Sequence, residues 1–316
     1  MKKNKIIIAT RGSMLALWQA EWIKAQLEAR NPGLKVELNK IKTTGDKILD
    51  VPLAKVGGKG LFVKEIEEAL LQKTADLAVH SMKDVPADLP EGLHIASITK
   101  REDPRDALLA GAKIKSFEDL PQGARIGTSS LRRICQIMSK RPDLKIIQLR
   151  GNVDTRIRKL DEGEFDAIIL AAAGVKRLGK AERITQIIPQ DLSLSAVGQG
   201  AVGIECRKDD AFTNSLVKAL DHAETSVCVR AERAFLKKLE GGCQVPIAGH
   251  ARLIINKAKS TPSLFIEGLV GSVSGDRIIR ESIEGPPEEA ESLGIALAET
   301  LLSRGAGKIL AEVYGR

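Results

Sequence analysis

The fold is decided by residues 5–41, which read KIIIATRGSMLALWQAEWIKAQLEARNPGLKVELNKI. The apolar run at 5–10 predicts a short buried strand, and residues 36–41 alternate as a second strand does. The segment between these two strands carries apolar residues at helical spacing. A strand, a helix and a strand in this order predict an α/β domain built on a parallel sheet.

The helix has clear start and stop signals. Ser13 is suited to cap its N-terminus, and Asn31-Pro32-Gly33 ends it. The apolar residues that recur at helical spacing are Leu15, Trp18, Trp22, Ala25 and Ala29. These signals predict a helix that begins after Ser13 and ends before Asn31.

Two further regions follow in this chain of 316 residues, a length that suits two or three domains. A second α/β unit begins near Asp103, with strands predicted at 125–127, 145–149 and 166–172, and the Gly-rich residues 195–203 resemble a crossing back to the first unit. After about Asp221 the pattern changes to a helix at about 223–239, strand-like runs at 247–255, 264–270 and 277–283, and a closing helix at about 288–302. This last region predicts a small α+β domain.

Charge is the informative feature of the composition. The formal net charge is +8, and the stretch 101–177 contributes +5 of it, from ten Arg and six Lys against eleven acidic residues. Aromatic residues make up only 3% of the chain, which leaves few platforms on which nucleic-acid bases could stack. No apolar run is long enough to cross a bilayer, and the apolar start is too short for a signal peptide. We therefore expect a cytoplasmic protein that binds a small acidic ligand rather than nucleic acid or a membrane.

The chain has four cysteines, Cys135, Cys206, Cys228 and Cys243. They form no CxxC pair and His is scarce, so no metal site is expected. The first three lie in apolar or helical patterns that predict burial, whereas Cys243 follows two glycines in a loop. A lone loop cysteine is inert more often than not, and the alternative is a nucleophile or an attachment point.

Basic and hydroxyl side chains gather where predicted strands end and helices begin. They are Arg11, Ser13, Thr128, Ser129, Ser130, Arg132, Arg133, Arg150, Arg156 and Arg177. Ligands of α/β sheets bind at the carboxyl ends of strands, and helix N-termini there offer N–H groups to anions. Any one of these arginines is as often simply solvated, but the set predicts a site for several carboxylates, because guanidinium groups bind carboxylates with paired hydrogen bonds.

Two segments of the first unit also have candidate roles. The Gly-rich residues 55–60, KVGGKG, lack the Ser or Thr of a phosphate-binding P-loop. They are either a surface loop or a lid on which Lys55 and Lys59 close over an anion. Asp84 follows a strand predicted at 76–80; such an Asp is more often a cap, and its functional alternative is to stabilise a cation or move a proton.

Seven motifs, in order along the chain, resemble those of the hydroxymethylbilane synthase (porphobilinogen deaminase) family. They are ATRGS at 9–13, KVGGKGLF at 55–62, HSMKDVP at 80–86, GTSSLRR at 127–133, LRGNVDTR at 149–156, VGQGA at 197–201 and GGCQVP at 241–246. The resemblance runs from residue 9 to the end of the chain, and seven motifs in order are far more specific than any one of them.

The resemblance implies three domains: an α/β lobe at 1–99 with 201–218, a second at 100–200, and an α+β domain at 219–316. The two lobes are expected to look like those of a periplasmic binding protein, with mixed, mainly parallel sheets. Family members add four porphobilinogen molecules, with loss of ammonia, to a covalent dipyrromethane cofactor, and then release the linear tetrapyrrole hydroxymethylbilane by hydrolysis. This is a transferase reaction of haem and tetrapyrrole biosynthesis.

The resemblance also assigns residues. Asp84 matches the catalytic Asp, Cys243 the thioether attachment of one dipyrromethane per chain, and Lys55 and Lys59 the lid loop. The positions that match carboxylate-binding residues are Arg11, Ser13, Lys83, Thr128, Ser129, Arg132, Arg133, Arg150, Gly151, Arg156 and Arg177. A monomer that passes its product to uroporphyrinogen-III synthase is implied as well.

One position departs from the family pattern, since Ser195 stands where the family usually has Pro. The expected consequence is a looser second crossing between the lobes, with the cleft chemistry unchanged. Two rival functions stay open from the residues. A non-catalytic anion-binding protein would explain the arginines, and a nucleic-acid-binding protein would explain the net charge.

Overall fold

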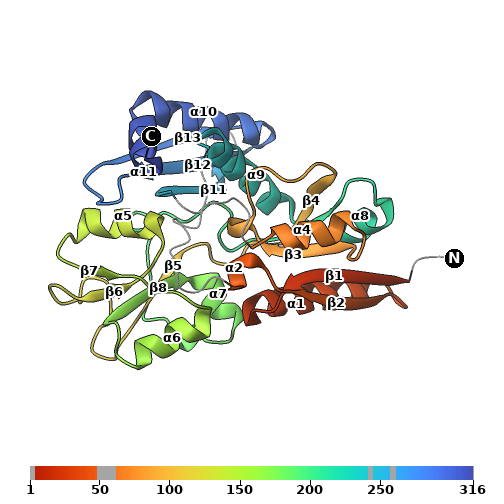
Figure 1. Ribbon diagram of the computed structural model, residues 1–316. Helices are drawn as coiled ribbons and strands as arrows, with labels where there is room; N and C mark the ends of the chain where they lie inside the picture. The colour runs from red at the N-terminus through yellow and green to blue at the C-terminus, as the bar shows by residue number, and fades with distance from the viewer. Residues whose placement is uncertain (1–3, 48–61, 241–244, 257–260, 316) are drawn as a thin grey trace. The chain divides into compact units, whose positions relative to one another are not determined.

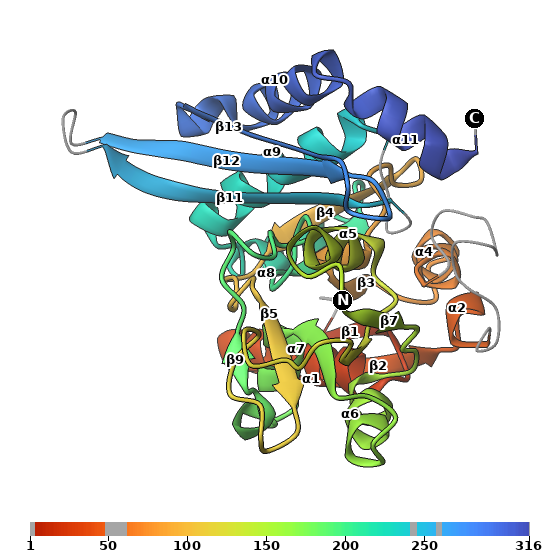
Figure 2. The ribbon, with the colours of Figure 1, turned by 90° about the vertical axis from the view of Figure 1, so that its left-hand side faces the viewer.

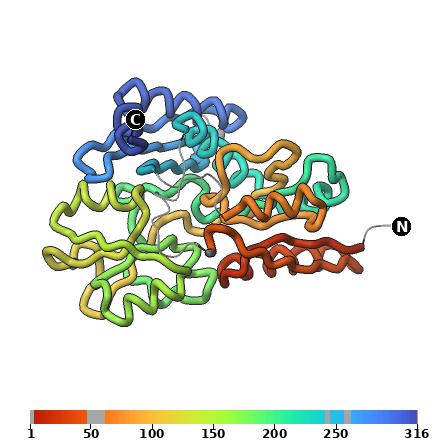
Figure 3. Tube along the Cα trace, viewed as in Figure 1, coloured from red at the N-terminus to blue at the C-terminus, as the bar shows by residue number. Residues whose placement is uncertain are grey.

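The computed structural model describes residues 4–47, 62–240, 245–256 and 261–315. They form two compact units, whose chain path can be followed in Figures 1 and 3. Unit 1 comprises residues 1–101 with 201–226, and unit 2 comprises residues 102–200 with 227–316. The three predicted domain boundaries stay a prediction. No helix among the described residues combines the length and the apolar character that a membrane span requires.

Unit 1 is built on a five-stranded sheet with the order β2-β1-β3-β10-β4. Its strands are β1 (Lys5–Arg11), β2 (Lys35–Ile41), β3 (Leu77–Ser81), β4 (Leu93–Ile98) and β10 (Val202–Arg207). β1 runs parallel to β2 and β3, whereas β10 pairs antiparallel with both β3 and β4. Four strands therefore share one direction, as predicted for a mixed, mainly parallel sheet.

Helices cover both faces of this sheet. They are α1 (Met14–Arg30), α2 (Thr44–Lys47), α4 (Lys64–Leu71), α8 (Ala211–Lys218) and the start of α9 (Ala223–Lys238), with the short 3₁₀ helix η1 (Met82–Asp84) after β3. α1 and α8 pack on one face through Ile23, Leu27 and Val217, and α4 packs on the other through Ile66 and Leu70. The alternation of side chains along each strand supplies both cores.

α1 (Met14–Arg30) confirms the predicted helix. It begins after Ser13, whose hydroxyl accepts a hydrogen bond from the Ala16 N–H at 3.4 Å, and it ends at Asn31. Its buried residues are Gln19, Ala20, Ile23 and Leu27. Trp18 is 38% exposed and stacks on Trp22, with the ring centroids 6.5 Å apart. The apolar residues of this helix occupy two faces, so spacing alone did not identify the buried one.

Unit 2 contains a second five-stranded sheet with the order β7-β6-β8-β5-β9. Its strands are β5 (Asp106–Ala110), β6 (Arg125–Gly127), β7 (Lys145–Ile147), β8 (Ala167–Ala171) and β9 (Gln186–Ile187). β6 is parallel to β7 and β8, and β5 is antiparallel to β8 and β9, so the pairing pattern repeats that of unit 1. The helices are α5 (Leu131–Lys140), α6 (Val153–Asp161), α7 (Ala172–Arg177) and η2 (Ala181–Arg183).

The C-terminal part of unit 2 is a three-stranded antiparallel sheet with helices. It comprises β11 (Ile247–Asn256), β12 (Thr261–Gly271), β13 (Ile278–Gly285), η3 (Pro287–Glu289), α10 (Ala290–Ser303) and α11 (Ala306–Tyr314). Figures 1 and 2 show α10 and α5 on opposite sides of this sheet. Phe235 of α9 fills the space above Gly268, where an added Cβ would lie 2.5 Å from its ring. The predicted α+β region is confirmed, although α11 was not expected.

Ser195 lies in the segment that leads to the second crossing and is fully buried. Its hydroxyl donates to the Pro104 carbonyl at 2.6 Å, its N–H donates to Gln190 Oε1 at 3.1 Å, and its carbonyl accepts from the Gly249 N–H at 3.0 Å. A proline could make neither of the two donor contacts, because it lacks both the hydroxyl and the N–H. These hydrogen bonds therefore restrain the segment at Ser195 and offset the absence of a proline ring.

We predict that Ser195→Ala lowers the free energy of unfolding by about 1 kcal/mol, because one buried hydrogen bond is lost. Ser195→Pro should cost more, since the N–H contact to Gln190 is lost as well. Urea denaturation followed by circular dichroism measures both. Ser215→Ala, at an exposed serine that bonds only within its own helix, is the control. A stability of Ser195→Ala equal to that of the control would contradict the restraint.

Candidate functional site

Asp84 is held at the carboxyl end of β3 by the short helix η1. The Met82 N–H donates to the Ala201 carbonyl at 3.0 Å, which ties the start of η1 to the strand β10. The Met82 side chain is buried, and it occupies the space that Gly203 leaves open, since a Cβ there would lie 2.1 Å from the sulfur. These contacts fix the turn on which Asp84 lies.

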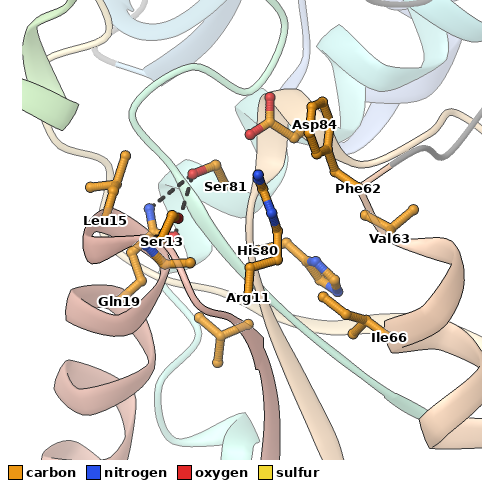
Figure 4. A pocket seen from close by; sticks show the side chains of 12 residues that line it. Arg11, Ser13, Leu15, Gln19, Phe62, Val63, Ile66, His80, Ser81 and Asp84 are labelled. Carbon is orange, nitrogen blue, oxygen red and sulfur yellow. Dashed lines mark hydrogen bonds between the residues drawn. The ribbon is translucent and has the colours of Figure 1, made fainter. Parts of the chain in front are cut away.

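A pocket in unit 1 brings Asp84 together with other predicted residues (Figure 4). Its polar lining comprises Arg11, Ser13, Gln19, His80, Ser81 and Asp84. Arg11 ends β1 and Ser81 ends the neighbouring parallel strand β3, so both lie at the sheet edge where ligands of α/β proteins bind. The structure thus unites Arg11, Ser13 and Asp84, as the sequence analysis expected.

Gln19 and Ser81 were missed as site residues. Gln19 Nε2 donates to the Ser81 hydroxyl at 2.9 Å, which joins the first turns of α1 to the end of β3. Gln19 is 2% exposed, and a buried amide within an amphipathic helix needs such a partner. A glutamine among apolar neighbours was the only signal in the sequence, and it does not identify a pocket.

Asp46 holds the Arg11 side chain. Arg11 Nε donates to Asp46 Oδ1 at 3.2 Å, and the guanidinium carbon lies 4.3 Å from the centroid of the Phe62 ring. Burial raises the pKa of Asp46, but hydrogen bonds from Arg11 and Thr43 lower it overall below its ordinary value. Asp46 therefore stays ionised and orients the guanidinium group of Arg11 beside the pocket.

A second group of predicted residues lies at the carboxyl edge of the sheet in unit 2. The Ser129 hydroxyl donates to the Leu149 carbonyl at 3.0 Å and accepts from the Leu149 N–H at 3.1 Å. These two hydrogen bonds join the loops that follow β6 and β7. Thr128 is buried, and its hydroxyl accepts from the Ser130 N–H at 3.2 Å. Arg150 follows in the same edge loop.

The loop at the start of α6 is shaped by Gly151. Its φ of 104° lies in the left-handed region, and an added Cβ would lie 2.8 Å from the Thr155 side chain. Asn152 caps α6 by accepting from the Thr155 N–H at 2.9 Å, and Arg156 Nε donates back to the Gly151 carbonyl at 2.8 Å. Gly151 and Arg156 thus form one compact turn.

Arg132 and Arg133 form an internal ion-pair cluster with Asp106. Both arginines are 5% exposed, and Asp106 is fully buried. The distances are 2.8 Å from Arg132 Nη1 to Asp106 Oδ2 and 2.7 Å from Arg133 Nη2 to Asp106 Oδ1. This placement differs from the expectation of carboxylate-binding side chains at an open edge, because both guanidinium groups already have a buried partner.

The charge of Asp106 is set by these arginines. Burial alone raises the pKa of Asp106, but the charges and hydrogen bonds of Arg132 and Arg133 lower it far below its ordinary value. Ser193 and Gln199 donate to the same carboxylate at 2.9 and 3.0 Å. Asp106 was missed by sequence reasoning, since a single acidic residue at the start of an apolar strand gives no sign of two distant partners.

Arg177 contacts the segments where the chain enters and leaves unit 2. Its Nη2 donates to the Gly200 carbonyl at 2.7 Å, and burial lowers its pKa while Glu102 partly offsets that effect. The neighbouring Lys176 lies 3.3 Å from Glu102 and 3.2 Å from Asp103. The last turn of α7 therefore fastens both crossing segments, a role that the expected carboxylate binding did not include.

Three predicted residues, Lys55, Lys59 and Cys243, lie outside the described part of the chain. The other cysteines, Cys135, Cys206 and Cys228, are free and buried, as predicted. Burial raises the pKa of the Cys135 and Cys206 thiols to about 12, although Arg132 partly offsets this for Cys135. Because the thiolate is the reactive form, these two thiols are unreactive at neutral pH.

Comparison with known proteins gives matches along the whole chain. Residues 6–215 match the family model "Porphobilinogen deaminase, dipyromethane cofactor binding domain", and residues 226–303 match "Porphobilinogen deaminase, C-terminal domain". The porphobilinogen deaminase of Geobacter sulfurreducens is 58% identical over 316 residues, covering 100% of this chain and 97% of that protein. The Geobacter metallireducens protein of the same name is 58% identical over 317 residues, with the same coverage.

Comparison with solved structures gives matches to binding proteins at low scores. The methionine-binding protein MetQ has a TM-score of 0.45 and 16% identity, covering 69% of this chain and 90% of that one. The periplasmic aliphatic sulphonate-binding protein SsuA of Escherichia coli has a TM-score of 0.41 and 15% identity. The match covers 75% of this chain and 71% of that one. The strand order and pairing of the two sheets, rather than these low scores, define the fold class.

We predict that Asp106→Asn lowers the free energy of unfolding by about 3–5 kcal/mol, because a neutral amide leaves two buried cations without a counter-charge. Thermal or urea denaturation measures this loss. The matched control is Asp143→Asn, which removes a more exposed pair with Arg141 and should cost far less. Equal losses in the two variants would show that Asp106 is not the counter-charge on which the cluster depends.

Proposed function

The chain belongs to the porphobilinogen deaminase family, and on that premise we propose that Asp84 is its catalytic residue. The activity is that of hydroxymethylbilane synthase, a transferase of tetrapyrrole biosynthesis. Four porphobilinogen molecules are joined head to tail with release of ammonia, and the linear tetrapyrrole is then released by hydrolysis. We assign residues of this chain to substrate binding, cofactor binding and catalysis.

The observation that carries the proposal is the pocket that places Asp84 beside Arg11, Ser13 and the Gln19–Ser81 pair. Porphobilinogen carries two carboxylates and a pyrrole N–H, so it needs cationic and hydroxyl partners together with a carboxylate. Loss of ammonia leaves positive charge on the pyrrole, and the Asp84 side chain stabilises that charge and accepts a hydrogen bond from the pyrrole N–H. The arginine holds the substrate carboxylate.

The dipyrromethane cofactor fits the residues at the carboxyl edge of the sheet in unit 2. Arg150, Arg156 and Ser129 lie around the turn at Gly151, which the Thr155 side chain packs against. In this proposal they bind cofactor carboxylates, and Cys243 holds the cofactor covalently. When bound, the cofactor supplies the pyrrole ring to which the first substrate is joined.

The remaining predicted residues have supporting or closing roles. We assign Arg132 and Arg133 to the internal support of the edge loop that carries Thr128 and Ser129, since both pair with Asp106. Arg177 is assigned to the crossing segment at Gly200, with ligand binding as a further role. Lys83 is placed by η1 next to Asp84, and Lys55 and Lys59 are proposed to cover the bound chain.

A cytoplasmic location and a monomeric state are also part of the proposal. The three free, buried cysteines of the described residues suit a reducing compartment. The product is proposed to pass to a uroporphyrinogen-III synthase. Native mass spectrometry of the purified protein tests the monomeric state directly.

We predict that Asp84→Asn lowers kcat by about 100-fold or more and changes KM by less than about threefold, because the lost charge acts on the transition state rather than on substrate binding. Steady-state assays of ammonia release measure both constants. Asp209→Asn, at an exposed carboxylate in the same unit, is the control. Near-normal turnover by the Asp84 variant would remove this residue from the catalytic role.

We predict that the intact mass of the purified protein exceeds the mass of its polypeptide, and that Cys243→Ser removes the excess together with the activity. Cys228→Ala, at a buried cysteine, should retain both. Electrospray mass spectrometry under denaturing conditions measures the covalent adduct. A bare polypeptide mass for fully active protein would refute attachment at Cys243 and would favour a non-covalent anion-binding protein.

A further inference from the structure

Three ionisable side chains meet beneath α4, next to the pocket that holds Asp84. His80 Nε2 lies 2.8 Å from Glu205 Oε2, and these two side chains are 4% and 1% exposed. Glu67 of α4 is 8% exposed and interacts electrostatically with both of them. We call His80, Glu205 and Glu67 the buried acid cluster.

Strand register explains why these residues meet. β3 and β10 pair so that His80 is opposite Gly203 and Ala78 is opposite Glu205. His80 and Glu205 are therefore diagonal neighbours on one face of the sheet. The same face carries Ala9 and Ala78, which pack against α4, and α4 adds Glu67 from above.

The buried acid cluster contains two carboxylates in a largely apolar core. Glu67 Oε1 and Glu205 Oε1 are both buried without a hydrogen-bond partner. Burial and the neighbouring charge of Glu205 raise the pKa of Glu67 to about 7, and His80 offsets only part of this effect. Two adjacent buried carboxylates rarely both ionise, so a proton on Glu67 is the simplest resolution.

Charged groups on the surrounding elements have partners elsewhere. Arg11 of β1 pairs with Asp46, Arg207 of β10 pairs with Asp210, and His94 of β4 hydrogen-bonds to Asn214. Among the described residues there is also no group of acidic, His or Cys side chains arranged to hold a metal ion. The proton on Glu67, rather than a further cation, therefore compensates the second carboxylate.

The buried acid cluster reaches the pocket through His80. The His80 side chain lines the pocket together with Ser81 and Asp84 (Figure 4), and it precedes Ser81 at the end of β3. Glu205 Oε2 accepts a hydrogen bond from Nε2–H of His80, and this contact fixes both the tautomer and the orientation of the ring. Any loosening of this contact moves part of the pocket wall.

We propose that His80, Glu205 and Glu67 are positioning residues for the reaction, in which the hydrogen bond to Glu205 orients His80 and a proton kept on Glu67 prevents a second buried charge. The proposal rests on the proposed role of the Asp84 pocket. When Glu67 loses its proton, its carboxylate competes with Glu205 for His80, and turnover falls. Bound substrate adds carboxylates nearby and holds the Glu67 proton more firmly. The alkaline limb of kcat therefore lies at higher pH than that of kcat/KM.

The first experiment compares the pH profiles of wild type and Glu67→Gln. The amide mimics the protonated acid, so the variant should keep turning over at alkaline pH where the wild type declines, with its limb displaced upward by about one pH unit or more. Glu68→Gln, at the adjacent exposed position, should follow the wild type throughout. Superimposed profiles of Glu67→Gln and wild type would overturn the proposal.

Glu205→Gln is the contrasting variant. It makes the same change from carboxylate to amide, but on β10 rather than α4, and it should lower activity instead of preserving it at alkaline pH. Loss of the negative acceptor should lower kcat by about 10-fold or more at every pH, with KM changed less than about threefold. Two variants with equal effects would indicate a merely structural core and would also overturn the proposal.

A measurement without substrate separates this proposal from the proposed function. A group whose pKa is raised on folding contributes stability below its unfolded pKa, and this contribution is lost as the pH rises through the folded value. Relative to wild type, the melting temperature of Glu67→Gln should therefore increase between about pH 5 and pH 7 and become constant above that range. A difference that stays constant between pH 5 and pH 7 would refute the proton on Glu67 even in an active enzyme. An inactive wild type with the expected melting curves would refute only the function.

Discussion

Much of unit 2 depends on the contact between the buried Asp106 carboxylate and two arginines. Asp106 begins β5, while Arg132 and Arg133 lie in the first turn of α5, so the contact joins the central sheet to a helix. Gln199 adds the segment that leads out of unit 2. Each charge would be costly to bury alone, and only the complete set is compensated. The edge loop with Thr128 and Ser129 is held at the start of the same helix.

Each unit has its own set of polar groups at a sheet edge. The pocket of unit 1 contains a carboxylate, Asp84, and Asp46 keeps Arg11 oriented beside it. The edge of the sheet in unit 2 offers arginines and hydroxyl groups that suit carboxylates. In the proposed reaction a growing tetrapyrrole gains carboxylates with every step, so cationic groups must outnumber the single catalytic acid. Under the proposed function, this need gives a physical reason for the excess of basic residues between 101 and 177.

The sequence predicted what depends on local pattern. The first strand, the Ser13 cap, the end of α1 and the placement of Arg11 and Asp84 at strand ends all follow from spacing and turn chemistry. Contacts between residues far apart in the chain were not accessible, since nothing near Arg132 indicates Asp106. The sequence did not indicate the buried face of α1 either, because that face is chosen by packing against α8 and the sheet. From the sequence, Ser195 indicates only that a proline is absent. Its hydrogen bonds to Pro104 and Gln190, which restrain the segment, are apparent only in the structure.

The position of β10 has a consequence for synthesis on the ribosome. This strand lies between β3 and β4 in the sheet of unit 1, yet it follows the whole five-stranded sheet of unit 2 in the chain. β4 has no neighbour in its sheet until residues 202–207 have emerged, whereas β5 to β9 can already pair with one another. The N-terminal half of the nascent chain must therefore wait with an unpaired edge while a later segment folds. A chaperone that shields β3 and β4 would act during that interval.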